Sequence, residues 1–159
     1  MKLKVCGITQ LEQLKQLDEM SVNYAGLIFY PQSARCIVDK LEAGEVKDLP
    51  LSLKKIGVFV NAQERFIMKQ VEDFGLDVVQ LHGDETVGFC KLISGQVTVA
   101  KAFRITQNNE QNIDWMLKPT KSIAIFTFSI QIEKMLTEEQ EKSLTGIFYV
   151  KTILINLFF

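Results

Sequence analysis

The chain has 159 residues, of which 47% are hydrophobic and 23% are charged, and its formal net charge at pH 7 is −1. This length and composition are typical of one folded domain and exclude a disordered chain. The near-neutral balance gives no electrostatic basis for binding nucleic acid or an anionic membrane, so we expect neither partner. The three cysteines lack paired spacing, which argues against a disulfide scaffold or a Cys-x-x-Cys metal site and favours a reducing compartment.

The two ends of the chain indicate a cytoplasmic protein. Lys2 and Lys4 interrupt the first apolar run, so we recognise no signal peptide there. The final stretch, YVKTILINLFF, is apolar but falls well short of the roughly 20 residues that a membrane helix needs.

Short apolar runs alternate with helical patterns along the first two-thirds of the chain. In chain order, the predicted strands are Leu3–Cys6, Ala25–Phe29, Ile56–Val60, Val78–Leu81 and Val97–Phe103. Capping residues before apolar stripes predict that the intervening helices begin at Thr9, Asp39, Asn61 and about Asp84. The later part predicts a strand over Ser122–Ile130, a charged helix over Glu133–Leu144 and an apolar tail.

Nearly continuous apolar strands, each followed by a helix, predict an α/β protein whose parallel strands are covered by crossover helices. Two architectures remain open, a doubly wound sheet and a (β/α)8 TIM barrel. No G-x-G-x-x-G follows the first strand, which weakens a dinucleotide-binding doubly wound fold. A complete barrel needs at least about 200 residues, so the rhythm fits an incomplete barrel of about five to six βα units.

Catalytic groups of such folds come from the carboxyl ends of strands and the loops that follow them. Cys6 stands at such an end, before Gly7 and a helix start, a setting that stabilises a thiolate. A cysteine in a strand is also commonly a small buried residue. Arg35 ends the loop Tyr30–Arg35 and suits a carboxylate or phosphate, although a surface charge is the simpler interpretation.

The other strand ends carry weaker candidates. His82 is the only histidine, and a lone histidine there is more often a structural hydrogen-bonding group than a catalyst. Asp84 is most simply the N-cap of the next helix. Asn61, the segment Gln80–Asp84 and the pair Phe103–Arg104 complete the set.

Five motifs follow one another along the first part of the chain: KVCGIT at 4–9, GLIFYPQSAR at 26–35, GVFVN at 57–61, VQLHGDE at 79–85 and KAF at 101–103. In this order they resemble phosphoribosylanthranilate isomerase, the (β/α)8-barrel enzyme of tryptophan biosynthesis. The resemblance covers residues 1 to about 105. It implies a small phosphorylated substrate and, for the intact family, a monomer or homodimer.

The resemblance also implies an Amadori rearrangement, without cofactor or metal, of N-(5-phosphoribosyl)anthranilate to 1-(2-carboxyphenylamino)-1-deoxyribulose 5-phosphate. A general acid opens the ribose ring to a Schiff base, and a general base removes the proton from carbon 2. The family's base matches Cys6, its arginine near the anthranilate carboxylate matches Arg35, and His82 falls in a matched motif as a substrate-binding residue. The family's acid is an aspartate in a Phe-Asp-Thr segment of strand six, and glycine-rich loops late in the barrel hold the phosphate.

After Phe103 this family pattern stops in the printed reading frame. No aspartate follows Asp114, and Gly146 is the only glycine after Gly95. The matched acid and phosphate loops are therefore absent from this frame.

The genetic code suggests where they are. In a shifted frame, the codons of residues 128–132 permit Phe-Asp-Thr-Asp, and those of residues 136–141 permit Tyr-Gly-Gly-Thr-Gly. We therefore hypothesise a frameshift between about Arg104 and Lys121. It divides the chain into a barrel part, residues 1–105, and a divergent tail, residues 106–159.

Three functional hypotheses follow. The first is the isomerase, with little activity expected of this chain because the matched acid and phosphate loops are missing. The second is a non-catalytic half-barrel that associates with another chain or with itself. The third is another phosphate-handling barrel, such as a lyase like tryptophan synthase α, which would need carboxylates where this chain has Cys6.

Overall fold

The computed structural model describes residues 2–102, and in this range strands and helices alternate throughout. The elements are β1 (Lys4–Cys6), α1 (Leu11–Glu19), β2 (Tyr24–Ile28), α2 (Ala43–Asp48), β3 (Lys54–Phe59), α3 (Glu64–Phe74), β4 (Val78–Leu81), α4 (Val87–Ser94) and β5 (Thr98–Lys101). Each of the five predicted strands is present. The segments predicted at Ser122–Ile130 and Glu133–Leu144 lie outside the described range.

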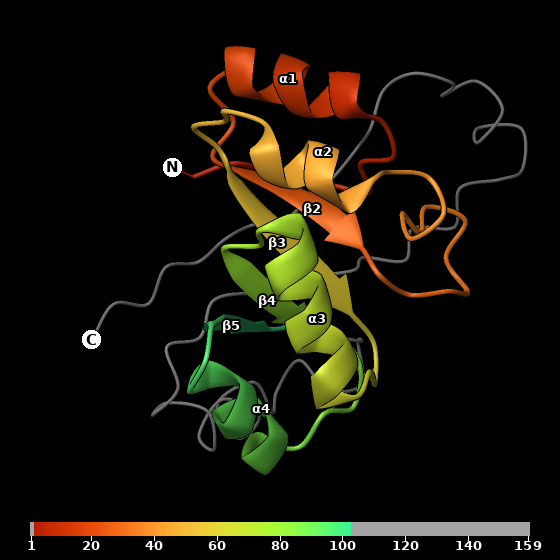
Figure 1. The fold of residues 1–159 in the computed structure, drawn as a ribbon. Helices are drawn as coiled ribbons and strands as arrows, with labels where there is room; N and C mark the ends of the chain where they lie inside the picture. Colours follow the sequence, from red (N-terminus) through yellow and green to blue (C-terminus); the bar gives the residue numbers. More distant parts are fainter. Residues whose placement is uncertain (1, 103–159) are drawn as a thin grey trace, which may run out of the picture.

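The order of the strands separates the two architectures that the sequence left open. All five strands are parallel, and neighbours in the chain are neighbours in the sheet, from β1 to β5. A doubly wound sheet reverses its direction of growth at a switch point, whereas a barrel adds each strand on the same side. Right-handed crossovers then put successive helices on one face, and Figure 1 shows α1 to α4 following one another along the strands. The structure therefore has the topology of a (β/α)8 barrel over five strands.

The main core lies between the sheet and these helices. Phe29 stacks on Phe59 with ring centroids 5.0 Å apart, and Phe74 of α3 meets Phe29 edge-on at the same distance. Apolar side chains from the strands and from every helix complete this core, among them Leu14, Leu27, Val46, Ile67, Leu81 and Ile93.

The opposite face of the sheet is concave. Lys4 of β1 and Gln80 of β4 both point to it, and the Lys4 ammonium donates a hydrogen bond to the side-chain oxygen of Gln80. Three strand spacings separate β1 from β4, about 14 Å in a flat sheet, so a direct bond requires the sheet to curl around this face. Ile56, Val78 and Ala100 form a small apolar cluster on the same side. The curl is that of a barrel wall.

The first two helices begin later than predicted. The side-chain oxygen of Gln13 accepts the backbone N–H of Thr9 at 2.9 Å and that of the next residue at 3.2 Å. The predicted start at Thr9 is therefore wrong by one position, because Gln10 is the N-cap and Gln13, not Glu12, accepts its backbone N–H. The start predicted at Asp39 is also wrong, because a turn closed by the Leu41 N–H and the Ile37 carbonyl at 3.1 Å precedes α2.

The loops before α3 and α4 explain the other two late starts. Asn61 has a φ of 50°, in the left-handed region, and lies in the loop after β3, whereas Gln63 is the N-cap of α3. Its side-chain oxygen accepts the Asp84 N–H at 2.8 Å, which holds Asp84 in the loop after β4. Thr86 is the N-cap of α4, since its hydroxyl accepts the Phe89 N–H at 3.2 Å. The prediction that Asp84 caps this helix is wrong.

The longest helix between residues 2 and 102 is α3, with 11 residues. A helix that crosses a bilayer needs about 20 apolar residues. No helix in this range could therefore span a membrane.

Candidate active site

Cys6 ends β1 on the concave face of the sheet. It shares this face with Lys4, two positions earlier, because side chains alternate along a strand. Its partner in the register of β2 is Gly26. A Cβ atom at position 26 would lie 2.6 Å from the Cys6 sulfur and 3.0 Å from its Cβ. The absence of a side chain at Gly26 therefore makes the space in which the half-buried thiol sits.

Arg35 lies against the turn that follows Cys6. Gly7 has a φ of +89°, which favours glycine, and a Cβ there would lie 2.8 Å from both the Cδ and the Nη1 of Arg35. The Arg35 side chain thus runs over Gly7, directly beside Cys6. Arg35 is exposed, and no carboxylate within residues 2–102 forms an ion pair with it. Its guanidinium is placed to meet an anion at the carboxyl end of β1.

His82 lies at the same end of the sheet, after β4. Its backbone N–H donates to the Phe59 carbonyl at 2.8 Å and so extends the pairing of β3 with β4. Its side chain is half-buried. The structure thus brings Cys6 and Arg35 together at one turn and places His82 three strands away along the same edge. The candidates Phe103 and Arg104 lie outside the described range.

A buried ionic cluster fixes the loop that carries His82. The Lys101 ammonium donates to the Glu85 carboxylate at 2.6 Å and to the Gly83 carbonyl at 2.5 Å. Glu85 in turn accepts the backbone N–H groups of Asn61 and Gly83 at 2.9–3.1 Å. Burial by itself raises the pKa of Glu85, but the hydrogen bonds from Lys101 and Asn61 and the charge of Lys101 outweigh burial and lower it. This cluster ties together the ends of β3, β4 and β5.

Lys4 was not singled out in the sequence, and Gln80 was named only within the segment Gln80–Asp84, although each residue carries a recognisable signal. Both are polar residues inside strands whose neighbours are apolar, and both are at least 95% shielded from solvent, with exposed fractions of 3% and 5%. A long polar side chain in a barrel strand either faces solvent or crosses the interior to a partner. Here the two cross the interior to each other.

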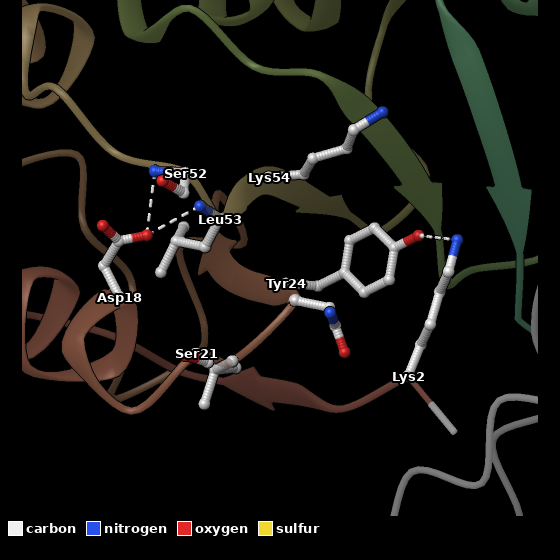
Figure 2. Close-up of a pocket in the computed structure, with 9 residues that line it drawn as sticks. Lys2, Asp18, Ser21, Tyr24, Ser52, Leu53 and Lys54 are labelled. Carbon is white, nitrogen blue, oxygen red and sulfur yellow. Dashed lines mark hydrogen bonds between the residues drawn. The ribbon is translucent and has the colours of Figure 1, made fainter.

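A pocket of about 390 Å³ lies at the other end of the sheet. Figure 2 shows it beside Tyr24, the first residue of β2, and Lys54, the first of β3, with Lys2 and Asp18 on its wall. In βα barrels this amino-terminal end of the strands serves stability, whereas chemistry takes place at the carboxyl end. The pocket is therefore separate from the Cys6 and Arg35 site.

Comparison with known proteins gives one consistent match. A family model described as N-(5'phosphoribosyl)anthranilate (PRA) isomerase matches residues 3–127. This range contains the five motifs, which end at residue 103, and continues to residue 127. The protein named N-(5'-phosphoribosyl)anthranilate isomerase in Citrifermentans bemidjiense is 38% identical over 104 residues, 65% of this chain and 50% of that protein. The protein of the same name in Aquifex aeolicus is 35% identical over 152 residues, 89% of this chain and 74% of that protein.

Solved structures agree with the sequence matches. Crystal structures of phosphoribosylanthranilate isomerase superpose on this chain, one of them described as mutually generated monomers of the dimeric Thermotoga maritima enzyme. It has a TM-score of 0.70 and 32% identity and covers 79% of this chain and 63% of that one. A second is described as a complex with reduced 1-(o-carboxyphenylamino)-1-deoxyribulose 5-phosphate, with a TM-score of 0.69 and 31% identity over 79% of this chain and 63% of that one.

The chain spans about half the length of the first curated relatives that it matches, 50% in two of them. The family model nevertheless covers most of the chain, residues 3–127. The chain therefore belongs to the N-(5'-phosphoribosyl)anthranilate isomerase family.

Proposed function

We propose that this chain carries the first five βα units of an N-(5'-phosphoribosyl)anthranilate isomerase of tryptophan biosynthesis, with Cys6 as the general base. The observation that carries the proposal is the seat of the Cys6 thiol on Gly26, on the concave face, with Arg35 across Gly7. The relative solved with a reduced carboxyphenylamino-deoxyribulose phosphate supports a substrate of this class for the present chain.

Cys6 acts in this proposal after the ribose ring has opened to a protonated Schiff base. Its thiolate takes the proton from carbon 2, so that an S–H bond forms as the C–H bond breaks. The electron pair left on carbon 2 becomes the double bond to carbon 1, and the C=N electron pair moves to the anthranilate nitrogen. The resulting enolamine then tautomerises to the ketone. Only the thiolate accepts a proton in this way, which makes the surroundings of Cys6 decisive.

Arg35 is proposed to bind the anthranilate carboxylate. A planar guanidinium donates two parallel hydrogen bonds to a carboxylate, which a lysine cannot reproduce. His82 is proposed to contact substrate from the loop after β4, which the Glu85 cluster holds in place. Because Arg35 touches Gly7, the carboxylate would be held beside the thiol that takes the proton.

A polypeptide of these 159 residues is proposed to have little isomerase activity, because the printed sequence has no aspartate after Asp114 to supply the matched acid. General acid–base groups each contribute typically 10²- to 10⁴-fold. We propose that the frameshift hypothesised between about Arg104 and Lys121 accounts for the absence of this acid from the printed frame. Resequencing the gene across this region tests the shift directly, and an unaltered sequence from independent DNA would remove it.

The test of function compares two proteins, the 159-residue chain and the protein read through the shifted frame. We expect isomerase turnover only in the second. In that protein, Arg35→Met should raise the KM for phosphoribosylanthranilate roughly 10- to 100-fold, since a charge-assisted pair contributes about 1.5–3 kcal/mol, with a smaller effect on kcat. An unchanged KM in Arg35→Met would contradict the role of Arg35, and no turnover in the shifted-frame protein would contradict the isomerase proposal itself.

The sheet edges favour a second candidate function. Within residues 2–102, β1 pairs only with β2, and β5 pairs only with β4. Open edges of a parallel sheet are sites for pairing with another chain. As a non-catalytic half-barrel, the 159-residue chain would elute from a size-exclusion column as a discrete dimer by light scattering. A monomer, or aggregates without a defined mass, would argue against this candidate.

We also propose a cytoplasmic location. Cys6, Cys36 and Cys90 are all free thiols, which supports a reducing compartment. Cellular fractionation with an antibody to the chain tests this location.

A further inference from the structure

Lys4 carries a buried ammonium group, and Gln80 alone does not offset the cost of burying its charge. Its side chain is 3% exposed, and its ammonium donates to the Gln80 side-chain oxygen. Burial of an ammonium is costly unless an opposite charge and further hydrogen bonds stabilise it. Within the described part of the chain, no Asp or Glu forms an ion pair with Lys4. The acceptor on Gln80 is a neutral amide oxygen, which supplies no opposite charge.

Cys6 is the anion-forming group that Lys4 faces. The two side chains leave the same face of β1 two positions apart. The pKa of Lys4 is lowered, with burial as the largest cause, and the charge of the Cys6 sulfur and a side-chain hydrogen bond with it oppose this lowering. Such an effect is mutual, because a thiolate that favours an ammonium is favoured by it to the same extent. Gly26 and Gln80 complete the arrangement, the first by seating the sulfur and the second by holding the ammonium.

We propose that Lys4 is a positioning residue for Cys6: its ammonium, held across the barrel interior by Gln80, stabilises the Cys6 thiolate on the concave face of the sheet. The geometry assigns Lys4 no contact with substrate. Its part in the isomerase reaction rests on the proposed function, whereas the coupling of the two side chains does not.

Other charged side chains near the concave face provide control variants for the effect of Lys4 on Cys6. Tyr24 and Lys54 begin β2 and β3 at the register position of Lys4, and Arg35 approaches Cys6 over Gly7. The side chains that β4 and β5 present to this face, Val78, Gln80, Thr98 and Ala100, carry no charge. Lys54 is exposed, so Lys54→Met removes the same charge from the same face without disturbing a buried pair. Arg35→Met removes the second cation close to the thiol.

The experiment measures the pH dependence of the alkylation of Cys6 by iodoacetamide. It uses the full 159-residue chain with Cys36→Ser and Cys90→Ala, so that Cys6 is the only thiol. Lys4→Met keeps the length and apolar stem of the side chain and removes its charge, and Gln80→Met keeps the lysine and removes its tether. Far-ultraviolet circular dichroism confirms the fold of each protein before alkylation.

We expect Lys4→Met to move the midpoint of the pH profile upward by about one unit, which slows alkylation roughly tenfold below the midpoint. At high pH its rate should equal or exceed that of the parent, because a more basic thiolate is the better nucleophile. Lys54→Met should leave the midpoint unchanged. Gln80→Met should move it in the same direction as Lys4→Met by a smaller amount, and it serves as the test if Lys4→Met does not fold.

Coincident profiles for the parent and Lys4→Met would overturn the proposal, as would an equal shift in Lys54→Met. If Lys4→Met does not fold, an unshifted profile in Gln80→Met would overturn it. Alkylation requires no substrate and no turnover, so this result is independent of the isomerase assay. The two proposals can therefore fail separately. If Lys4→Met moves the alkylation midpoint but the protein read through the other frame has no isomerase activity, the coupling of Lys4 with Cys6 stands and the isomerase proposal fails.

Discussion

At the scale of single residues, the candidate site depends on two glycines whose lack of a side chain leaves space for Cys6 and Arg35. Gly26 gives the Cys6 sulfur its space, and Gly7 lets Arg35 pass beside the end of β1. Neither requirement is visible in the pattern of apolar residues, because each arises between segments that are far apart in the sequence. The KVCGIT motif identified Cys6, but the partner that shapes its surroundings belongs to β2.

Gly26→Ala tests whether the Cys6 thiol needs the space above Gly26. The new methyl group would lie 2.6 Å from the Cys6 sulfur and 3.1 Å from its Cα, so β1 or the thiol must move. We expect the free energy of unfolding to fall by about 1–3 kcal/mol, the typical cost of overpacking, and the rate of Cys6 alkylation to change. The matched control is Gly44→Ala in α2, where no atom lies within 4 Å of the new Cβ. Urea unfolding curves that coincide for Gly26→Ala and the parent would contradict the tight seat.

At the scale of elements, two carboxylates hold loops to their neighbouring strands. Asp18, in the last turn of α1, accepts the backbone N–H groups of Ser52 at 2.8 Å and Leu53 at 2.7 Å, just before β3 (Figure 2). Glu85 and Lys101 do the same for the loop after β4, at the opposite end of the sheet. Each connects elements that the hydrophobic core alone would leave less firmly aligned.

Asp18→Ala should lower the free energy of unfolding by about 1–3 kcal/mol, because it leaves two backbone N–H groups without their acceptor. Asp18→Asn retains an acceptor oxygen and should cost less. Glu19→Ala, at the exposed neighbouring position, is the control and should change stability little. The measurement is urea unfolding followed by circular dichroism. Equal stabilities for Asp18→Ala and Glu19→Ala would show that the loop is held in another way.

Glu85→Gln should cost about 3 kcal/mol at neutral pH, because it leaves the buried Lys101 without its counter-ion. The pKa of Glu85 is lowered in the folded protein, so its contribution is fully present above its ordinary pKa of 4.5 and is lost as the pH falls through the folded value. The stability difference between the parent and Glu85→Gln should therefore shrink below pH 4.5. Urea unfolding at several pH values measures it, and a difference that stays constant into acid would contradict the assignment.

Much of the fold could be predicted at this scale, and the reason is physical. Strands such as Val78–Leu81 are predicted from nearly continuous apolar runs, which are typical of a buried parallel strand. Helix starts were less accurate, because the residues that cap the helices are not those that the local pattern favoured: Gln10 is the N-cap of α1, and Thr86 is the N-cap of α4. The hydrogen bond between Lys4 and Gln80 could not be predicted from the sequence, because it joins residues 76 positions apart and forms only once the sheet has curled.

At the scale of the whole molecule, a single strand order explains why these groups meet. Five parallel strands in sequence order curl around one face, and that curl brings Lys4 to Gln80 and leaves Cys6 on the inside. The family match continues to residue 127, beyond the part that the motifs delimited.

The most direct test of the account is the turnover of the shifted-frame protein with and without the Cys6 thiol. Cys6→Ala should lower kcat by about 10²- to 10⁴-fold with a smaller change in KM, the loss typical of a missing general base. Cys36→Ala, which removes another free thiol, should retain the activity of the parent. A Cys6→Ala protein with the parent's kcat would contradict the central claim that Cys6 is the base of this active site.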